Sequence, residues 1–315
     1  MAGPVSERLP PQVELLIDER ASARAERDFA AADALRDRIR AMGWEVIDLP
    51  AGSTARPSLP PAAGEAGYAR PEDLESMLDQ PATVAASVQL LAEQHGKDLE
   101  RFLRGLAAHP PAVDWELVMV ANAPTFGITQ LLDGLSLPVE PTVLASAERL
   151  GWADARNLGL RRSRGEVTLL VDTSVEPEGD FVGPLLDAFE DPSVGIAGAW
   201  GLVSATGRTF EEAPPGEVDA VEGYCLAIRR GVLREAGLFD HHFRFYRNAD
   251  LDFSFQARAA GWRAIAVADL PLRRHEHRGY AALPPSERER LSKRNFYRFL
   301  KHWGDRRDLL IHHEA

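Results

Sequence analysis

The stretch FYRNADLDFSFQARAAGW, residues 245–262, places two carboxylates where a helix is predicted to start around Ala249. The free N–H groups and the dipole of a helix start stabilise an ionised carboxylate. Such a carboxylate can accept the proton of an attacking hydroxyl, although aspartate is also favoured in a first turn for structural reasons. Because positions i and i+2 lie about 200° apart on a helix, Asp250 and Asp252 cannot share one substrate face.

A third carboxylate, Asp172, directly follows the apolar run VTLLV. Carboxylates are rarely buried without a partner. An aspartate that ends a buried strand therefore more often belongs to a site than to the packing, and we expect Asp172 to be a site residue.

Other polar residues have similar placements. Asn122 follows the run WELVMV, and Arg156 and Asn157 fall in a predicted helix, GWADARNLGLRRS. His275 and His277 are two residues apart on a segment predicted to be extended, so they should project to one side. The alternatives are a surface cation at Arg156 and a solvated basic loop for RRHEHRG.

Strands and helices alternate from residue 84 to residue 303. The predicted strands are VAASVQLLA, WELVMVAN, VTLLVDTS, VGIAGAW, GYCLAIRR and RAIAVADL, and the main predicted helices are KDLERFLRGLAAH, GDFVGPLLDAFED and the helix after Asn248. Apolar strands alternating with helices predict an α/β fold, with a mostly parallel sheet covered by helices on both faces. Ligands of such sheets bind beyond the carboxyl ends of the strands, where Asn122 and Asp172 lie.

Three regions are predicted. Residues 1–51 form a helical hairpin, in which Asp28 caps the second helix, Gly43 ends it, and a brief extended piece follows from Trp44. Residues 52–83 are rich in Pro, Ala, Gly and Ser, which predicts a linker, with a short helix in RPEDLESMLD. Residues 84–315 form the main domain.

The composition is that of a soluble globular protein, with 45% hydrophobic and 27% charged residues. The formal net charge of −12 argues against non-specific binding to nucleic acid or an anionic membrane, outside local basic patches. The single cysteine, Cys225, excludes a disulfide scaffold and is expected to be a small buried side chain. Since we find no signal peptide or membrane span, we expect a cytoplasmic protein.

Two motifs of the main domain are specific when taken together. They are GWADARNLGLRRSRGE, residues 151–166, before a strand ending in aspartate, and GLFD…FY…D-x-D…R-x-x-GW later in the chain. Their order and spacing resemble family 2 glycosyltransferases, nucleotide-sugar enzymes of the GT-A fold, and most closely the rhamnosyltransferase-like branch. The resemblance covers about residues 84–303. It implies an inverting transfer of a sugar from a nucleoside diphosphate donor to a hydroxyl of a saccharide or lipid-linked acceptor.

The resemblance also implies roles for the residues singled out above. Asp250 would be the catalytic base, which leaves Asp252 to local structure. Asp172 would hold the donor diphosphate with a divalent cation, Mn²⁺ or Mg²⁺. Of His275 and His277, both candidates for this donor site, His275 is preferred as the second metal ligand. The further donor-binding candidates are Asn122, Arg156 and Asn157.

Three positions depart from the family pattern. Ala121 stands where the family has an aspartate that reads the base, Ser174 replaces the last aspartate of the metal motif, and Ala249 replaces a glutamate before the base. A neutral serine is a poorer ligand for a hard cation, although Arg156 could neutralise phosphates instead. The alternative reading is therefore a non-catalytic protein that keeps the fold for binding or scaffolding.

Residues 11–52, which include LLIDERASARAERDFAAADALRDRIRAMGWEVIDLPAG, resemble the C-terminal tail of cysteinyl-tRNA synthetases. The zinc-binding and nucleotide-binding signatures of the synthetase body do not occur in this chain. We expect the hairpin to pack or to bind a partner. Association with RNA is a third, weaker reading, because acidic residues outnumber basic ones in the hairpin, and no nucleic acid is expected as a partner.

The segment SERERLSKRNFYRFLKHWG, residues 286–304, predicts a basic amphipathic helix. Its apolar side chains, which recur at helical spacing, are Leu291, Phe296, Phe299, Leu300 and Trp303. An aromatic stripe of this kind usually packs on a core. The alternative is peripheral association with a membrane that presents a lipid-linked acceptor.

Overall fold

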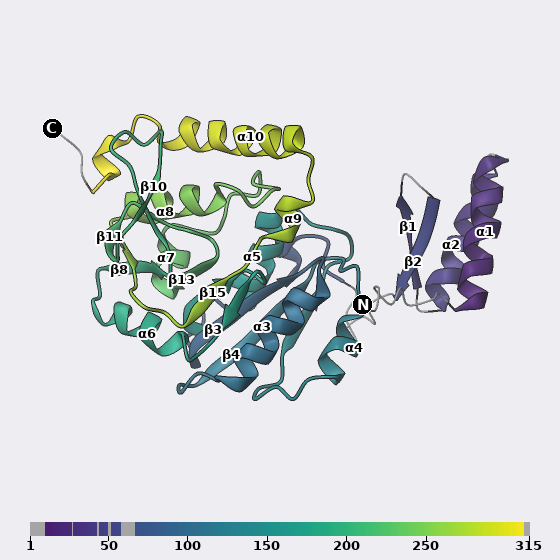
Figure 1. The fold of residues 1–315 in the computed structure, drawn as a ribbon, viewed down its shortest axis with the longest axis horizontal. Coiled ribbons are helices and arrows are strands. Elements are labelled where there is room, and N and C mark those ends of the chain that lie inside the picture. Colours follow the sequence, from purple (N-terminus) through teal and green to yellow (C-terminus); the bar gives the residue numbers. More distant parts are fainter. Residues whose placement is uncertain (1–9, 27, 43, 50–51, 58–66, 312–315) are drawn as a thin grey trace, which may run out of the picture.

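The computed structural model describes residues 10–26, 28–42, 44–49, 52–57 and 67–311, which form an N-terminal unit and a larger α/β domain (Figure 1). The N-terminal unit contains α1 (Pro11–Ala25), α2 (Phe29–Ala41), β1 (Trp44–Leu49) and β2 (Gly52–Pro57). Asp28 caps α2, since its Oδ1 accepts a hydrogen bond from the Ala31 N–H at 3.0 Å. The two predicted helices and the extended piece are present, whereas Gly43 lies outside the described residues.

Strand β2 lies in the stretch predicted to be a linker, and that prediction is wrong for residues 52–57. β2 pairs antiparallel with β1 over its whole length. Ala55 of β2 is buried together with apolar residues of the helices, which are Val13, Leu16, Ile17 and Ile39. Glycine and proline disfavour strands, so the local sequence does not favour this strand. It forms because it pairs with β1 and because Ala55 is buried.

Residues 67–83 also differ from a linker, because they pack on the larger domain. Tyr68 forms a β-bridge to the residue after β5 (Thr142–Ala145). Leu78 is buried, and its carbonyl oxygen accepts a hydrogen bond from Arg234 Nε at 2.6 Å. The short helix predicted here is a single 3₁₀ turn, η1 (Pro71–Asp73). We therefore place the start of the larger domain near residue 67 rather than 84.

An eight-stranded sheet forms the centre of the larger domain, in the order β11-β14-β8-β13-β6-β3-β4-β5. The pairs β3–β4, β3–β6, β4–β5 and β8–β14 are parallel, whereas β13 runs antiparallel to β6 and β8, and β11 to β14. The predicted α/β fold with a mostly parallel sheet is confirmed. The strands not yet bounded are β3 (Val84–Ala92), β4 (Trp115–Ala121), β6 (Gly165–Val171), β8 (Val194–Gly198), β11 (Gly216–Val218), β13 (Cys225–Arg229) and β14 (Arg263–Ala266).

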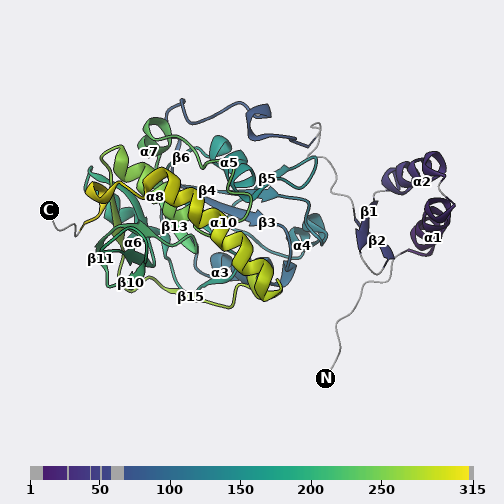
Figure 2. The same cartoon turned by 90° about the horizontal axis from the view of Figure 1, so that it is seen from above.

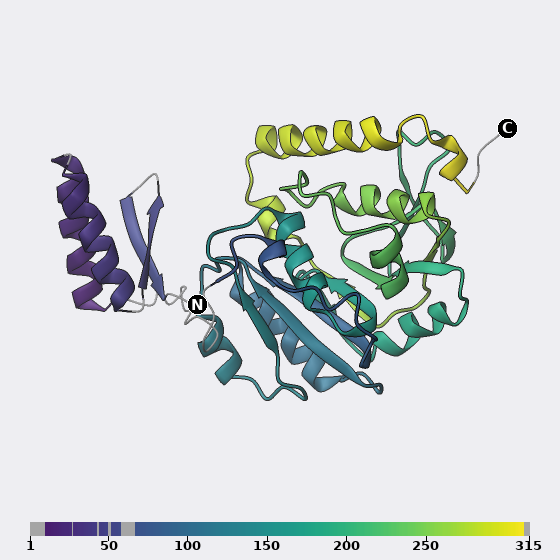
Figure 3. The ribbon, with the colours of Figure 1, turned by 180° about the vertical axis from the view of Figure 1, so that it is seen from behind.

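Helices cover both faces of the sheet, as Figures 1 and 3 show from opposite sides. Apolar residues of α3 and α6 pack on one face, and those of α5, α7 and α8 pack on the other. The buried side chains of α3 recur every three or four residues, which produces its amphipathic character. The helices are α3 (Gly96–Ala108), α4 (Ile128–Asp133), α5 (Trp152–Arg162), α6 (Val182–Asp187), α7 (Arg230–Glu235) and α8 (Ala249–Ala259), with the 3₁₀ turn η2 (Ala188–Glu190).

Helix α10 (Pro285–Trp303) crosses the domain over α8, as the view from above shows (Figure 2). Phe299 of α10 is fully buried, and its ring lies edge-on to Phe255 of α8 at 5.0 Å between centroids. The prediction that this helix packs on the core is confirmed. Among the described residues, no helix combines the length and apolarity needed to cross a membrane. The remaining elements are β7 (Val175–Pro177), β9 (Gly201–Val203), β10 (Glu211–Ala213), β12 (Ala220–Val221), β15 (Leu272–Arg274), α9 (Arg278–Ala281) and η3 (Arg307–Leu309).

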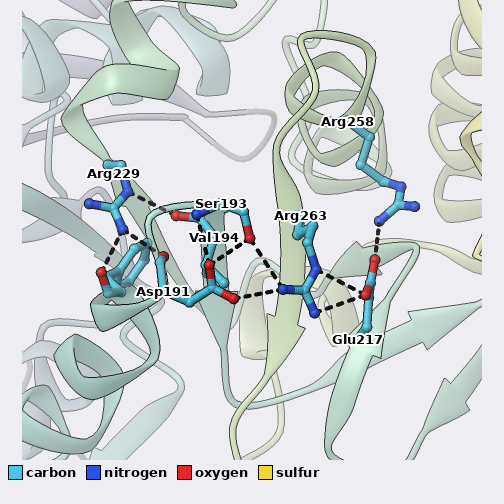
Figure 4. Close-up of polar contacts among 8 residues, drawn as sticks. Asp191, Ser193, Val194, Glu217, Arg229, Arg258 and Arg263 are labelled. Atoms are coloured by element: carbon cyan, nitrogen blue, oxygen red, sulfur yellow. Dashed lines mark hydrogen bonds and ion pairs between the residues drawn. The ribbon is translucent and has the colours of Figure 1, made fainter.

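Charged side chains hold the outer edge of the sheet together (Figure 4). Arg263 of β14 donates hydrogen bonds to Asp191 Oδ2 at 2.7 Å and to Glu217 Oε2 of β11 at 3.0 Å. Ser193 Oγ donates to the other carboxylate oxygen of Asp191 at 2.6 Å. Exposed ion pairs contribute at most about 1 kcal/mol each, but this network attaches the three-residue strand β11 to its neighbour.

Removal of residues 1–66 should leave the larger domain folded, because the N-terminal unit has its own apolar core. Removal of residues 1–83 should lower the free energy of unfolding by at least about 3 kcal/mol, because Arg230 and Arg234 then lose carbonyl acceptors at Gln80 and Leu78. Denaturant unfolding of the two truncated proteins tests both statements. Loss of cooperative unfolding in the 67–315 fragment would mean that the two units share a core.

Candidate functional site

A cavity of about 380 Å³ lies where β6 ends beside α8 and α10, and we call it the larger pocket because a pocket that shares three of its residues is smaller. Asp172, Asp250, Glu222, Tyr246 and His277 are among the residues that line it. Ordinary small-molecule pockets hold roughly 300–1,000 Å³, so this cavity is large enough for one or two sugar rings. The predicted placement of Asp172 and Asp250 in one cleft is confirmed.

Asp172 follows the last residue of β6, as predicted. One carboxylate oxygen, Oδ1, accepts hydrogen bonds from the Ser174 N–H at 2.8 Å and from Ser174 Oγ at 2.5 Å. The other oxygen, Oδ2, lies 3.4 Å from His277 Nε2. Burial alone would raise the pKa of Asp172, but the bonds from His277 and Ser174 outweigh it and hold the pKa below its usual range. Asp172 is therefore ionised, with one oxygen fixed and one facing the histidine.

His277 connects Asp172 to an aromatic wall. Its ring stacks on Tyr246 with a centroid separation of 4.5 Å and an interplanar angle of 12°. The Tyr280 N–H donates to Nδ1 at 3.1 Å, which orients Nε2 toward Asp172. Burial would lower the pKa of His277, but the hydrogen bond and the charge of Asp172 outweigh it and raise the pKa above its ordinary value.

Asp250 lies in the first turn of α8, after Asn248, whose φ of 65° is a conformation that asparagine tolerates. Asp250 Oδ2 accepts a hydrogen bond from the Gly223 N–H at 2.8 Å, and Oδ1 accepts one from the Leu251 N–H at 3.0 Å. Burial raises the pKa of Asp250 in spite of these two bonds. The N–H bonds favour the charged form, as expected of a helix start, but desolvation outweighs them in the direction of the pKa shift.

Asp252 points away from the larger pocket. Its Oδ1 accepts hydrogen bonds from His302 Nδ1 and from Trp303 Nε1, both at 2.9 Å. The predicted separation of the two carboxylates is confirmed, since Asp252 is absent from the lining of the pocket. Its partners are side chains of α10, which are distant in sequence rather than local.

A smaller pocket of about 90 Å³ lies on the other side of His277. It shares Asp172, Tyr246 and His277 with the larger pocket, and Glu93 and Arg156 also line it. The stacked Tyr246 and His277 rings therefore form a partition between the two pockets.

Arg156 is buried, so the alternative of a surface cation is excluded. Its Nη1 donates to the Gln89 backbone and side-chain oxygens at 3.2 Å, and its Nη2 donates to the Val171 carbonyl at 3.1 Å. Burial lowers the pKa of Arg156 to about 10, against the opposing charges of Asp172 and Glu93. Its guanidinium nitrogens thus donate to protein oxygens, although Arg156 also lines the smaller pocket.

The two predicted asparagines do not line either pocket. The Asn157 amide bonds to both backbone groups of Phe239, at 2.8 and 3.0 Å. Asn122 donates to Glu93 Oε1 at 2.6 Å, and its Oδ1 accepts from the Leu150 N–H at 2.8 Å. Both side chains hold loops in place, so the geometry does not support the donor contacts expected of them.

His275 also differs from its predicted position. Its Nε2 lies 2.6 Å from Glu176 Oε2, and it lines neither pocket. β15 ends at Arg274, so strand geometry does not continue to residue 277 and the two histidines find separate partners. The histidine next to Asp172 is His277, which corrects the preference for His275 as a metal ligand.

Glu222 is a pocket residue that the sequence reasoning missed. Burial and the charge of Asp250 raise its pKa, although Arg274 Nη1 lies 3.1 Å from its Oε2. Arg274 in turn lies over the rings of Trp200 and Tyr224, 5.3 and 5.1 Å from their centroids. Glu222 lies in the turn between the two-residue strand β12 and the antiparallel strand β13. The available signal was that an antiparallel strand begins at the sheet edge where its parallel neighbours end.

A divalent cation at this site would find few protein ligands. Asp172 Oδ2 and His277 Nε2 face each other, while Asp172 Oδ1 already accepts two hydrogen bonds from Ser174. Among the described residues, the groups of three such ligands lie around Asp240 and not at Asp172. Two ligand atoms fit an ion that takes its remaining ligands from diphosphate and water.

The family described as Glycosyl transferase family 2 matches residues 92–253, just over half of the chain. Among solved structures, the chain is similar to GalNAc-T7 with UDP, GalNAc and Mn²⁺ (TM-score 0.54, 16% identity, 73% of this chain and 50% of that one). It is also similar to the mannosyltransferase PcManGT from Pyrobaculum calidifontis with GDP-Man and Mn²⁺ (TM-score 0.51, 19% identity, 74% of both chains). These likenesses confirm the GT-A fold.

The Cysteinyl-tRNA ligase anticodon binding domain matches residues 6–50. The N-terminal part is 41% identical over 66 residues to a cysteine–tRNA ligase of Burkholderia lata, which is 18% of this chain and 14% of that protein. It is 54% identical over 44 residues to the enzyme of Nitratidesulfovibrio vulgaris, or 14% of this chain and 9% of that one. The chain thus covers only a small share of these curated relatives, as the predicted resemblance to a tail implied.

The contact with Asp172 should give His277 a pKa above the 6.5 of a free imidazole. The ion pair then stabilises the fold fully below pH 6.5, and this contribution fades as the pH rises through the raised pKa. An NMR titration of the histidine ring measures the shift, and Asp172→Asn should lower the pKa. An unchanged histidine pKa in Asp172→Asn would contradict the pairing.

Proposed function

The chain belongs to glycosyl transferase family 2, and from this premise we propose that it transfers a sugar from a nucleoside diphosphate donor to a hydroxyl of an acceptor. The observation that carries the proposal is the shared pocket of Asp172, His277 and Asp250. Membership of the rhamnosyltransferase-like branch and the identity of the sugar stay predictions.

Asp250 is suited to be the general base. Backbone N–H groups hold both of its oxygens toward Gly223 and Leu251, and burial raises its pKa. A carboxylate with a raised pKa is a stronger proton acceptor than a free one. Asp250 would take the proton of the acceptor hydroxyl as its oxygen bonds to the anomeric carbon. The bond from that carbon to the diphosphate breaks, and the nucleoside diphosphate leaves. A single base opposite the leaving group favours inversion.

Asp172 and His277 would act on the leaving-group side. Without a bound cation, the His277 Nε2–H can donate a hydrogen bond to a phosphate oxygen, but the negative charge of Asp172 would repel the diphosphate. With a cation, the deprotonated Nε2 would be a ligand instead. A divalent cation, when bound to Asp172 and His277, supplies charge that stabilises the departing diphosphate. In this proposal His277 replaces His275 as the second protein ligand.

A donor nucleotide that occupied the smaller pocket would require a change in the partition. The smaller pocket holds about 90 Å³, below the roughly 300 Å³ at which small-molecule pockets begin. The Tyr246 and His277 rings would therefore have to shift so that the two pockets join. The same observation favours the alternative function, a family member that binds a smaller ligand or a partner without catalysis, as the changes at Ala121, Ser174 and Ala249 also suggest.

RNA association of the N-terminal unit is supported only by the family name that its sequence matches. Acidic residues outnumber basic ones in this unit, so a phosphate backbone would not be attracted to it as a whole. RNA association is therefore not part of the proposed function.

Asp250→Asn should lower turnover by a factor on the order of 10²–10⁴, as expected for a lost general base, with donor affinity little changed. Asp252→Asn is the matched control, because this side chain contacts α10 instead of the pocket. The amide oxygen of Asn can still accept the bonds from His302 and Trp303, so turnover should stay near that of the wild type. Sugar release from a panel of nucleoside diphosphate sugars provides the assay. Equal turnover in the wild type and Asp250→Asn would refute the base.

Calorimetry with UDP and GDP, with and without Mn²⁺, tests the donor site. His277→Gln should weaken binding about ten-fold or more, since it removes a donor to a charged phosphate, whereas His275→Gln should leave binding unchanged because His275 bonds to Glu176. Equal losses in the two histidine variants would contradict the assignment of His277. A wild type that binds a nucleoside diphosphate but releases no sugar from any donor would favour the non-catalytic alternative.

A further inference from the structure

The outward face of α10 carries a row of exposed side chains. One side of the helix is buried through Asn295 and Phe299, and the opposite side is uncovered along the top of the domain (Figure 1). The exposed residues recur at spacings of three and four, so they share this uncovered face. They are Arg290, Lys293, Arg294, Tyr297 and Lys301, and we call them the basic stripe.

The basic stripe is locally cationic in an acidic protein. Helix α10 contains six arginine or lysine residues and two glutamates, whereas the whole chain has a net charge of −12. The glutamates pair with Arg290 and Lys293 at 2.6 Å. Within the part of the chain that the structure describes, Arg294 and Lys301 form no ion pair, so their charges are available to an external anion.

Tyr297 lies between these two cations and is 67% exposed. A tyrosine ring has an apolar body and a polar hydroxyl, which suits it to the boundary between lipid headgroups and acyl chains. Single-stranded nucleic acid usually lies in a positively charged groove with stacking platforms. The basic stripe instead lies on the convex surface of one helix, which fits a flat partner better.

We propose that the basic stripe docks the protein on an anionic lipid surface. The net charge of the chain opposes approach, but at physiological salt charges more than about 8 Å apart are largely screened. The residues next to the membrane therefore decide the interaction, and in the docked orientation these are the cations of α10 and Tyr297. Amphipathic helices with cationic faces and aromatic anchors bind membranes in this way.

Docking would also bring the larger pocket near the membrane. Phe296, which precedes Tyr297, lines that pocket from α10. An acceptor attached to a lipid could then reach Asp250 without leaving the bilayer. This last step rests on the proposed function, whereas the docking itself does not require catalysis.

Co-sedimentation with lipid vesicles tests the docking, with the full chain and without any sugar donor. The wild type should bind vesicles containing phosphatidylglycerol at low salt, bind much less at high salt, and not bind pure phosphatidylcholine. Arg294→Glu combined with Lys301→Glu should lower the partition coefficient at least about 25-fold, from roughly five-fold per lost charge. Tyr297→Ala should lower it several-fold.

The matched control is Lys97→Glu combined with Arg104→Glu on α3, because both residues are exposed and the change in net charge is the same. This variant should bind like the wild type. Equal losses in the two double variants would mean that only net charge matters and would overturn the docking face. Binding to a single-stranded RNA but not to vesicles would also overturn the docking face.

Circular dichroism confirms that each variant is folded. Failure of vesicle binding would leave the turnover test of Asp250 unaffected, so the two proposals can fail separately.

Discussion

Strand β13 runs antiparallel between β6 and β8, with Cys225 opposite Val171, and this register determines the site. It brings the turn before β13 to the edge of the sheet where β6 ends. The Tyr224 carbonyl there accepts the Asp172 N–H at 3.0 Å, and the Gly223 N–H reaches Asp250. A shift of one residue in a strand moves every side chain to the opposite face. Because both faces of β13 are buried, the same shift would exchange Cys225 and Ala227 with Leu226 and Ile228 between the two apolar cores.

Charge compensation divides the carboxylates of the pocket into two kinds. Asp172 faces His277, whereas Glu222 shares Arg274 with Glu212 and keeps a raised pKa because it is buried near Asp250. Asp250 is held only by backbone N–H groups among its described hydrogen bonds. An ion pair favours the charged form of a carboxylate, whereas burial without one favours the neutral form. The raised pKa of Asp250 and the lowered pKa of Asp172 follow from this difference and suit a proton acceptor and a permanent negative charge.

Helix α10 links the site to the outer surface of the domain. It packs on α8 through Phe299 and through the bonds that His302 and Trp303 donate to Asp252. Asp250 lies on the opposite side of α8, so the same contacts that bury Asp252 fix the angle at which Asp250 enters the pocket. Removing one partner of a buried charged group is costly because the charge is left uncompensated. The position of the proposed base thus depends on a helix that also presents the basic stripe.

The sequence by itself determined what depends on neighbours along the chain. Apolar runs and helical spacing located the strands, the helices, the aspartate that ends β6 and the carboxylates that begin α8, because these features arise within a few residues. The tertiary structure decided the rest through contacts between distant residues. His277 rather than His275 lies next to Asp172, and the Asn157 amide bonds to the backbone of Phe239. Glu222 lines the pocket from the turn before the antiparallel strand β13. No local pattern specifies such partners, since each exists only once the sheet has brought remote segments together.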